Sequence, residues 1–326
     1  TSIRQYFDEN GFIEVNTPVL TSSDCEGAGE QFKVMSDTAA TQEQGRGTEK
    51  KTKEEGDKGT VAKKKTKWHN EFFDTEVGLT VSGQLQAEMA ACALSRVYTF
   101  GPTFRADNSN TRNHLAGISY YYAHHLLCWC LNVLFFFLEE FWMIEPEMAF
   151  AGLEDNMRVA EGLVKRVVRD LLDKNAEEMK FFQDRIDNQV MGRMEKTLNA
   201  PFKVMRYGEA VEVLEGAIRQ GEKFEFPVAW GEDLSKEHEK YLVEKAAGGH
   251  PLFVVNYPKA LKPFYMKLNP ASPDGKRDTV QAMDLLVPTI GELIGGSVRE
   301  ENYDLLKQRY STLSLSLSLS LSLSLS

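Results

Sequence analysis

The strand candidates of this chain are short, and helices separate most of them. Ile3, Tyr6 and Phe7 recur at helical spacing, and the alternating run 12–15 follows as a strand. Further strand candidates are residues 79–82, 98–105, 253–255, 264–267 and 283–287, and the helix candidates among them are 84–96 and 157–172. Because strand and helix do not alternate as regularly as a parallel sheet requires, we expect an α+β fold.

The chain is acidic and rich enough in apolar residues to fold as an enzyme. Its 326 residues carry a formal net charge of −10 and are 42% hydrophobic, which allows one large core or two smaller ones. The acidic balance argues against a protein that wraps nucleic acid, since phosphate binding needs a concentrated basic face. The four cysteines show no CxxC spacing, and no signal or transit peptide is recognisable. We therefore expect a reduced, cytoplasmic protein, with an organellar form open if a transit peptide has been lost.

Residues 38–70 are polar and rich in lysine, interleaved with Glu, Gly and Thr. Such a stretch buries too little apolar surface to offset the entropy lost on ordering. We interpret it as a solvated surface loop and disfavour the alternative of an RNA-binding arm.

Residues 117–138 form an apolar run that is long enough to span a bilayer. His124, His125 and Asn132 interrupt it, so a membrane anchor is the weaker of two interpretations. The spacing of the two histidines with Cys128 and Cys130 also allows a zinc site, which the apolar surroundings disfavour. The preferred hypothesis is that 117–139 is an insertion translated from a retained intron.

Residues 311–326 are mostly alternating leucine and serine, a low-complexity tail. As a strand, this tail would place every leucine on one face, which no globular enzyme needs. Because a TC dinucleotide repeat translates as Ser-Leu, we extend the intron hypothesis to this segment. Residues 1–310 would then be an incomplete catalytic domain.

Three sequence blocks carry candidate chemistry, although neither a GxxxxGK[ST] loop nor a GxGxxG turn is present to bind a nucleotide. The block 11–20 joins a helix to a strand and a proline turn. At the end of the predicted strand 98–105, Arg105 and Asp107 are two residues apart and therefore project from one face. An arginine fork could there grip an α-phosphate. The block 292–299 places Glu292 and Arg299 around glycines that permit a close backbone approach.

At these residues the chain resembles the class II aminoacyl-tRNA synthetases, and within them the asparaginyl enzymes of the aspartyl/asparaginyl branch. Residues 11–20 are similar to motif 1 at the dimer interface of that family, and 104–107 are similar to the opening of motif 2. The matching stretches 24–30, 80–88, 140–147 and 291–299 occur in the family's order. The resemblance implies a class II catalytic domain, in which helices flank an antiparallel sheet.

The resemblance implies a role for each matching residue. Glu26 and Gln84 would hold the amino acid, and Arg105 would clamp the α-phosphate. Asp107, His114 and Leu115 would line the ATP site with Phe141, whose ring would stack on adenine. Glu292 and Asp284 would hold Mg²⁺, and Arg299 would pair with the end of the substrate side chain. Taken singly, these residues have plainer explanations, such as a surface ion pair for Arg105 and Asp107.

The choice between an amide and an acid substrate depends on two positions. A carboxamide offers N–H donors that suit an acceptor such as Glu145, whereas a substrate carboxylate would need an extra cation. Ala87 stands where the aspartyl branch would carry lysine, which favours asparagine. The resemblance thus implies an asparagine–tRNA ligase that uses ATP and Mg²⁺, acts on tRNA(Asn), forms a homodimer and has no membrane partner. The alternatives are an aspartyl-tRNA synthetase and a non-catalytic paralogue or fragment.

The chain also departs from the family pattern. Asp107 stands in place of glutamate, and Arg112 is displaced by one position from the arginine expected to contact ATP. The third motif, expected after Tyr303, and the N-terminal anticodon-binding barrel are missing, so we expect impaired activity. The central expectation is spatial: six residues should converge on one pocket, namely Glu26, Gln84, Arg105, Glu145, Glu292 and Arg299.

Overall fold

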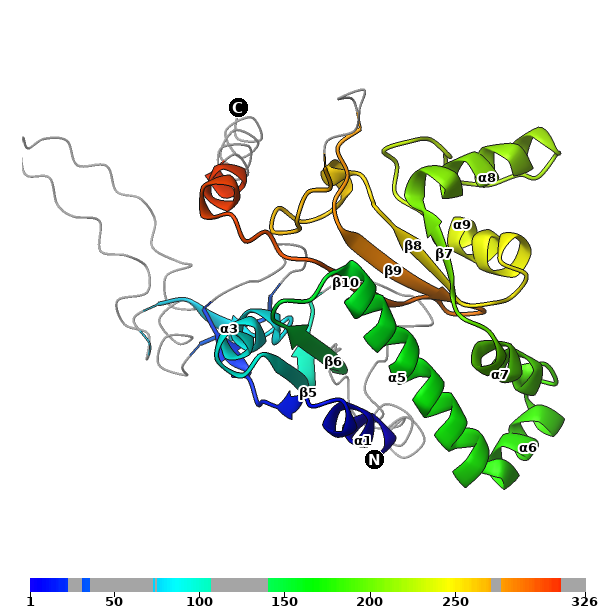
Figure 1. Ribbon diagram of the computed structural model, residues 1–326, viewed down its shortest axis with the longest axis horizontal. Helices are drawn as coiled ribbons and strands as arrows, with labels where there is room; N and C mark the ends of the chain where they lie inside the picture. The colour runs from blue at the N-terminus through cyan, green and yellow to red at the C-terminus, as the bar shows by residue number, and fades with distance from the viewer. Residues whose placement is uncertain (23–30, 36–72, 74, 107–139, 271–276, 312–326) are drawn as a thin grey trace, which may run out of the picture. The chain divides into compact units, whose positions relative to one another are not determined.

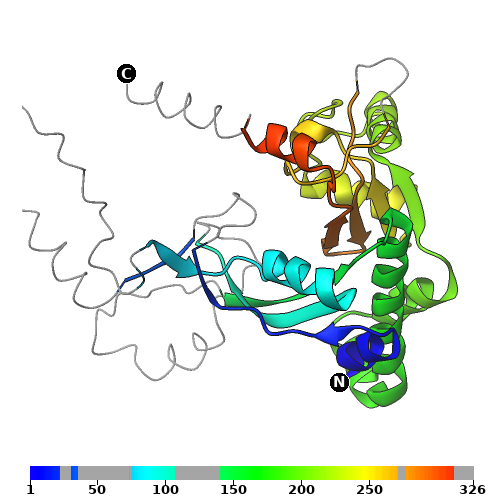
Figure 2. The same ribbon diagram turned by 60° about the vertical axis from the view of Figure 1, so that its left-hand side comes forward.

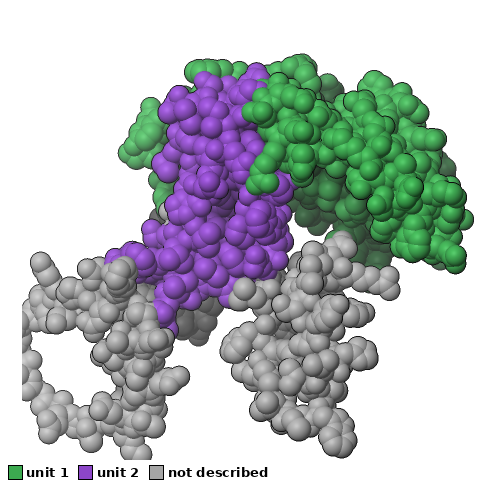
Figure 3. All heavy atoms as spheres, turned by 90° about the horizontal axis from the view of Figure 1, so that it is seen from below, with its two compact units in different colours: residues 1–10, 150–326 green, residues 11–149 purple. Residues whose placement is uncertain are grey.

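The computed structural model describes residues 1–22, 31–35, 73, 75–106, 140–270 and 277–311. By its internal contacts the chain divides into two compact units. The first combines residues 1–10 with 150–326, and the second comprises residues 11–149 (Figure 3). The polar segment 38–70, the apolar insertion 117–139 and the tail from 312 onwards lie outside the described residues, as do the histidines and cysteines of the possible zinc site.

The second unit contains a three-stranded sheet in the order β1-β5-β6. β5 (Arg96–Phe104) pairs with β6 (Glu140–Met148) in antiparallel register along its whole length, from Arg96 opposite Met148 to Phe104 opposite Glu140. β1 (Ile13–Glu14) joins β5 in parallel. Segments far apart in the sequence thus form one continuous ladder, visible in Figure 2.

A short helix and a small sheet complete this unit. β2 (Leu20–Thr21) and β3 (Lys33–Val34) flank β4 (Val77–Leu79) in antiparallel pairing. Helix α3 (Gln84–Leu94) packs on β5 and β6, and its small side chains allow a close approach. Ala87 and Ala91 are buried there against Val97.

In the first unit, helix α1 (Ser2–Glu9) packs against the long helix α5 (Leu153–Lys174). Phe7 is fully buried, and the Tyr6 hydroxyl donates to the carbonyl of Val159 at 2.9 Å. Arg166 of α5 pairs with Glu9 of α1 at 2.6 Å. Helices α6 (Ala176–Arg185) and α7 (Val190–Asn199) follow and pack on α5.

A four-stranded sheet in the order β10-β9-β8-β7 forms the centre of this unit. Its strands are β7 (Lys203–Arg206), β8 (Leu252–Val255), β9 (Ala282–Val287) and β10 (Gly291–Ser297). β7 runs parallel to β8, and the other pairings are antiparallel. β8 and β9 are buried on both faces, and their residues are apolar throughout except for Asp284 of β9.

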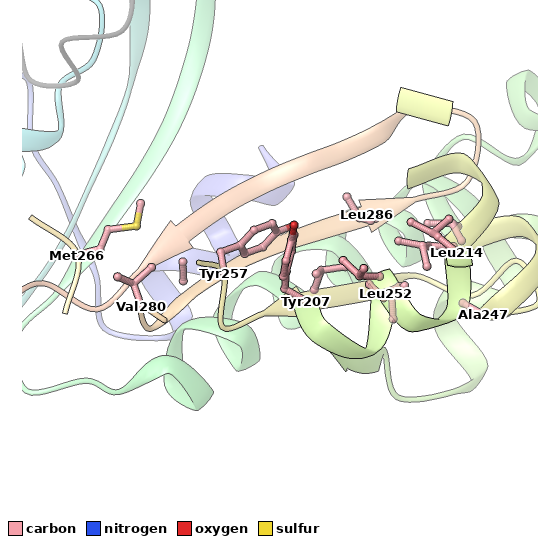
Figure 4. Packing of buried hydrophobic residues seen from close by; sticks show 14 residues of the cluster. Tyr207, Leu214, Ala247, Leu252, Tyr257, Met266, Val280 and Leu286 are labelled. Atoms are coloured by element: carbon pink, nitrogen blue, oxygen red, sulfur yellow. The ribbon is translucent and has the colours of Figure 1, made fainter. Parts of the chain in front are cut away.

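Helices cover the two faces of this sheet with separate cores. On one face Phe253 and Met283 pack with residues of α5. On the other face Leu252 and Leu286 pack with residues of α8 (Tyr207–Arg219) and of the π-helical turn η2 (Leu242–Ala246), which continues α9 (Lys236–Tyr241) (Figures 1 and 4). Alternate residues of one strand thus supply both cores.

The predicted α+β class is confirmed, with three differences in detail. Two strand pairings, β1 with β5 and β7 with β8, are parallel. The predicted strand at 264–267 is wrong: Met266 forms only an isolated bridge with Arg299, after the 3₁₀ turn η3 (Lys259–Leu261). The strand expected at 79–82 lies earlier, as β4. Among the described residues, no helix has the length and apolar character needed to cross a membrane.

Candidate active site

One face of the β5–β6 pair gathers three predicted site residues of the second unit, Arg105, Phe141 and Glu145. Residues that lie opposite each other in an antiparallel pair project to the same face, as do alternate residues of one strand. Thr99 lies opposite Glu145, Gly101 opposite Met143, and Thr103 opposite Phe141. A Cβ built at Gly101 would meet no atom of the described residues within 4 Å, so they leave this part of the face open.

Glu145 lies at one end of this face, at the N-terminus of α3. The backbone N–H of Gly83 donates to its Oε2 at 2.9 Å, and the Thr99 hydroxyl donates to the same oxygen at 3.0 Å. The Ser82 hydroxyl is bonded to Oε1. A carboxylate is favoured at this position because unpaired N–H groups and the helix dipole both attract negative charge.

Arg105 and Phe141 lie at the other end of the face. The guanidinium carbon of Arg105 is 5.4 Å from the centre of the Phe141 ring, and a guanidinium nitrogen is 4.0 Å from the Met143 sulfur. Along β6, Phe141 is four residues from Glu145, or about 13 Å at the usual rise of a strand. The face therefore has room for an extended ligand with a polar end and a ring end.

Gln84 occupies the first turn of α3, next to Glu145. Its backbone N–H donates to the Ser82 hydroxyl at 3.1 Å, and its side-chain amide donates to Glu88 at 3.0 Å. Ala87, one turn further on, is fully buried. A lysine at that position would have to be accommodated within an apolar contact.

Two carboxylates of the first unit converge beside β10. A Cβ built at Gly295 would lie 2.8 Å from Oε1 of Glu292 and 3.6 Å from Oδ1 of Asp284, so both oxygens reach one place. The other oxygen of Asp284 forms an ion pair with Lys262 at 2.7 Å. Oxygen ligands at one place are the donors that Mg²⁺ prefers.

Glu239 of α9 adds a third acidic side chain nearby. Its carboxylate accepts the backbone N–H of Glu292 at 3.3 Å. Burial, with the nearby charges of Glu292 and Asp284, raises the pKa of Glu239 to about 7. Burial and the charge of Asp284 likewise raise the pKa of Tyr257, over whose ring the Lys262 ammonium lies at 4.1 Å.

Arg299 follows β10 and lies on a tyrosine. Its guanidinium is 4.5 Å from the centre of the Tyr265 ring, and it donates to the Ser297 hydroxyl at 2.8 Å. Stacking on a ring holds a guanidinium in one plane while its edge remains able to bind an anion.

The structure thus brings Arg105, Phe141 and Glu145 to one face in the second unit, with Gln84 at the start of α3. In the first unit, one oxygen each of Asp284 and Glu292 lies within 4 Å of the same point. Four predicted residues lie outside the described residues: Glu26, Asp107, His114 and Leu115. Within the described ranges, no group of three or more His, Cys, Asp or Glu side chains could hold a metal ion. The convergence of all six key residues on one pocket stays a prediction.

The sequence did not single out several partners of these residues. Ser82 lies within the matched stretch 80–88, but its hydroxyl becomes significant only when Glu145 is placed beside it. Thr99 and Lys262 have no local signal. Strand register places Thr99 opposite Glu145, and Lys262 meets Asp284 although the two are 22 residues apart in the sequence.

A comparison with protein families gives one match that covers most of the chain. The family described as "tRNA synthetases class II (D, K and N)" matches residues 1–44 and 137–319. These ranges contain β6, β9, β10 and α9, whereas α3 and β5 lie in the gap between them.

Curated relatives extend the match to nearly the whole sequence. The chain is 45% identical over 314 residues to "Asparagine--tRNA ligase" of Myxococcus xanthus, covering 96% of this chain and 57% of that protein. It is 46% identical over 315 residues to the protein of the same name from Thermosynechococcus vestitus, covering 97% and 58%. The chain therefore spans little more than half the length of these relatives.

Solved structures of similar fold include an asparaginyl-tRNA synthetase and an aspartyl-tRNA synthetase. Asparaginyl-tRNA synthetase from Pyrococcus horikoshii, complexed with asparaginyl-adenylate, superposes with a TM-score of 0.67 at 29% identity, covering 96% of this chain and 54% of that chain. An aspartyl-tRNA synthetase from Entamoeba histolytica, at 18% identity and a TM-score of 0.58, covers 94% and 45% and shares the fold. By sequence and fold, the chain belongs to the class II tRNA synthetases of the D, K and N group.

Proposed function

We propose that this chain is the catalytic part of an asparagine–tRNA ligase. The reaction would join asparagine to ATP as asparaginyl-adenylate, release pyrophosphate and then transfer the amino acid to tRNA(Asn). The observation that carries this proposal is Glu145, an acceptor held by three donors at one end of an open face that ends at Arg105. The 45% identity to the asparagine–tRNA ligase of Myxococcus xanthus supports the proposal.

The amino acid would bind at the α3 end of the face. Glu145 would accept an N–H of the substrate carboxamide, and Gln84 and Glu26 would hold the amino-acid backbone. Arg299 would bind the carboxamide oxygen, because a guanidinium donates and cannot accept. This assignment needs residues of both units and is part of the proposal.

ATP would bind towards Arg105. Its guanidinium would bind the α-phosphate and stabilise the negative charge that grows there as the amino-acid carboxylate attacks. The ring of Phe141 would cover adenine, and Asp107, His114 and Leu115 would complete the site. No side chain forms a covalent intermediate in this mechanism, so the rate enhancement comes from positioning and electrostatics.

Mg²⁺ would bind between Glu292 and Asp284. The pair fits such an ion, because Oε1 of one and Oδ1 of the other reach the same place while Lys262 holds the second oxygen of Asp284. Two carboxylates leave coordination positions for water and for phosphate oxygens. When bound, the ion would neutralise charge on the leaving pyrophosphate.

We further infer that residues 1–310 are an incomplete catalytic domain in which 38–70 is a polar loop and 117–139 an insertion, and that the low-complexity tail 311–326 follows it. We also propose that the protein forms a homodimer, is cytoplasmic and has no membrane partner. These proposals are supported by the resemblance of residues 11–20 to motif 1 and by the acidic, cysteine-poor composition.

The test is ATP–pyrophosphate exchange with asparagine and with aspartate as the amino acid. We expect a low rate that depends on asparagine, and at least a hundredfold loss for Arg105→Ala, since one transition-state donor typically contributes that much. Arg158→Ala is the matched control, because Arg158 is an exposed arginine whose ion pair with Asp155 lies within α5. A preference for aspartate would favour the aspartyl alternative.

The non-catalytic alternative needs a second measurement. Titration calorimetry with asparaginyl and aspartyl sulfamoyl-adenosine, non-reactive analogues of the adenylates, detects binding without turnover. Binding of the asparaginyl analogue without exchange would assign the chain to the non-catalytic alternative. Failure to bind either analogue would reject both the ligase and the synthetase-derived binding protein.

A further inference from the structure

The carboxylate of Glu145 is bonded by three donors that come from two different elements. Ser82 and Gly83 lie at the N-terminus of α3, and Thr99 lies on β5 directly opposite Glu145. Ser82 and Thr99 are 3% and 4% exposed, so water does not easily replace their hydroxyls. Glu145 is therefore held from two sides within the protein.

The chemistry of Ser82 and Gly83 shows that both donate their hydrogen bonds to Glu145. The Ser82 hydroxyl oxygen accepts the backbone N–H of Gln84 at 3.1 Å, which leaves its own proton for Glu145. The backbone N–H of Gly83 can only donate. Both groups therefore require Glu145 to act as an acceptor.

The number of bonds limits what Glu145 can still accept. A carboxylate offers about four acceptor positions, two on each oxygen. Gly83 and Thr99 occupy both positions on Oε2, and Ser82 occupies one on Oε1. One position on Oε1 is left for a ligand.

We propose that Thr99 is a positioning residue that sets the specificity of this site. By occupying Oε2 together with Gly83, it directs the remaining acceptor position of Glu145 to one N–H of a substrate carboxamide. The inference rests on the proposed function and adds to it a residue without a predicted role. It also names the recognised chemistry: a single neutral N–H donor rather than a charged group.

This arrangement separates asparagine from aspartate by a simple difference. The carboxamide supplies the N–H that the open position accepts, whereas the carboxylate of aspartate would bring lone pairs and a like charge to it. Without Thr99, Oε2 would have a free acceptor position and the carboxylate could rotate. Selection against the wrong ligand would then weaken.

The experiment measures binding of asparaginyl and aspartyl sulfamoyl-adenosine to four proteins by titration calorimetry. These are the unchanged chain, Thr99→Val, which removes the hydroxyl at constant shape, Thr99→Ser, which retains it, and the control Thr197→Val. Thr197 is a buried threonine of α7 whose hydroxyl donates to the Arg193 carbonyl at 3.0 Å. Thermal melting of each variant reports whether the fold is retained.

We expect Thr99→Val to weaken binding of the asparaginyl analogue roughly tenfold or more, the usual effect of losing a hydrogen bond to a charged group. In Thr99→Ser and in Thr197→Val, the dissociation constant of the asparaginyl analogue should stay within about threefold of that of the unchanged chain. The dissociation constants of the two analogues should become more similar only in Thr99→Val. A crystal structure of this variant should show the Glu145 carboxylate turned away from its original position.

Two outcomes would overturn the inference and are distinct from each other. If the unchanged chain prefers the asparaginyl analogue and Thr99→Val binds it equally well, the role of Thr99 is rejected while the proposed function stands. If the unchanged chain binds neither analogue, the proposed function fails first, and the inference with it. Thr99→Ala provides the same comparison should the valine variant not fold.

Discussion

The Lys262 ammonium lies 2.7 Å from Oδ2 of Asp284, a carboxylate predicted to hold a metal ion. The two side chains are only 18% and 10% exposed, so this is a largely buried pair. The two oxygens of the carboxylate have different neighbours. Oδ2 pairs with Lys262, and Oδ1 lies on the same side as Oε1 of Glu292, next to Gly295. Lys262 thus offsets the charge of Asp284 and fixes which of its oxygens a cation can use.

Replacing Lys262 by methionine should therefore destabilise the protein. The change leaves Asp284 buried without its cation, which typically costs about 3 kcal/mol. Urea denaturation followed by circular dichroism measures this loss. The control is Lys180→Met, whose exposed pair with Asp184 should contribute at most about 0.5 kcal/mol. Equal effects of the two changes would contradict the assignment of a buried pair.

The stability of the chain should fall as the pH rises through neutrality, because of Glu239. Burial raises its pKa from an ordinary value of 4.5 to about 7, so the folded protein holds a proton that the unfolded chain has released. The free energy of unfolding decreases with pH wherever the folded state binds more protons. The contribution of neutral Glu239 is thus complete below pH 4.5 and lost as the pH passes 7.

The check is a series of urea denaturations between these two pH values, without added divalent cations. Glu239→Gln should flatten the dependence, since an amide does not titrate. Glu215→Gln is the control, because Glu215 belongs to an exposed pair with Arg219. An unchanged slope in Glu239→Gln would assign the pH dependence to other groups.

Truncation of Phe7 should show how strongly α1 is held by α5. Phe7 is fully buried, and Phe7→Ala should lower the free energy of unfolding by about 3–5 kcal/mol through lost transfer energy and a cavity. Phe181 of α6 is 58% exposed, so Phe181→Ala should change it by less than about 1 kcal/mol. If both changes had a small effect, α1 would not be part of the folded core.

Two glycines near Glu145 should respond to alanine in opposite ways. A Cβ at Gly83 would lie 2.5 Å from the Thr17 hydroxyl and 3.2 Å from Oε2 of Glu145, so Gly83→Ala should cost about 1–3 kcal/mol. At Gly101 the added methyl meets nothing within 4 Å, and Gly101→Ala should be neutral or stabilising by up to about 1 kcal/mol. Thermal denaturation of both variants compares them directly.

The fold class was accessible from the sequence because its signals are local. The period of α5 and the apolar runs of β8 and β9 predict those elements from neighbouring residues alone. The strand expected at 264–267 fails for the complementary reason. Of these residues Met266 forms a single bridge, with Arg299, and no local pattern distinguishes such a bridge from a strand.

The candidate site was predictable only in part. Arg105 and Glu292 were singled out because each lies in a short block with its own chemistry, and Glu145 because the stretch 140–147 resembles the family. Thr99, Lys262 and Glu239 were not, since their significance comes from a partner distant in the chain.

The sequence by itself determined the types of helix and strand, the family and the chemical groups available for catalysis. Only the tertiary structure decided which oxygen of Glu145 remains open and which oxygen of Asp284 faces Glu292. The physical reason is that periodicity and motif chemistry act between near neighbours. Strand register and packing instead set the distances between side chains separated by tens of residues, and hydrogen bonds depend on those distances.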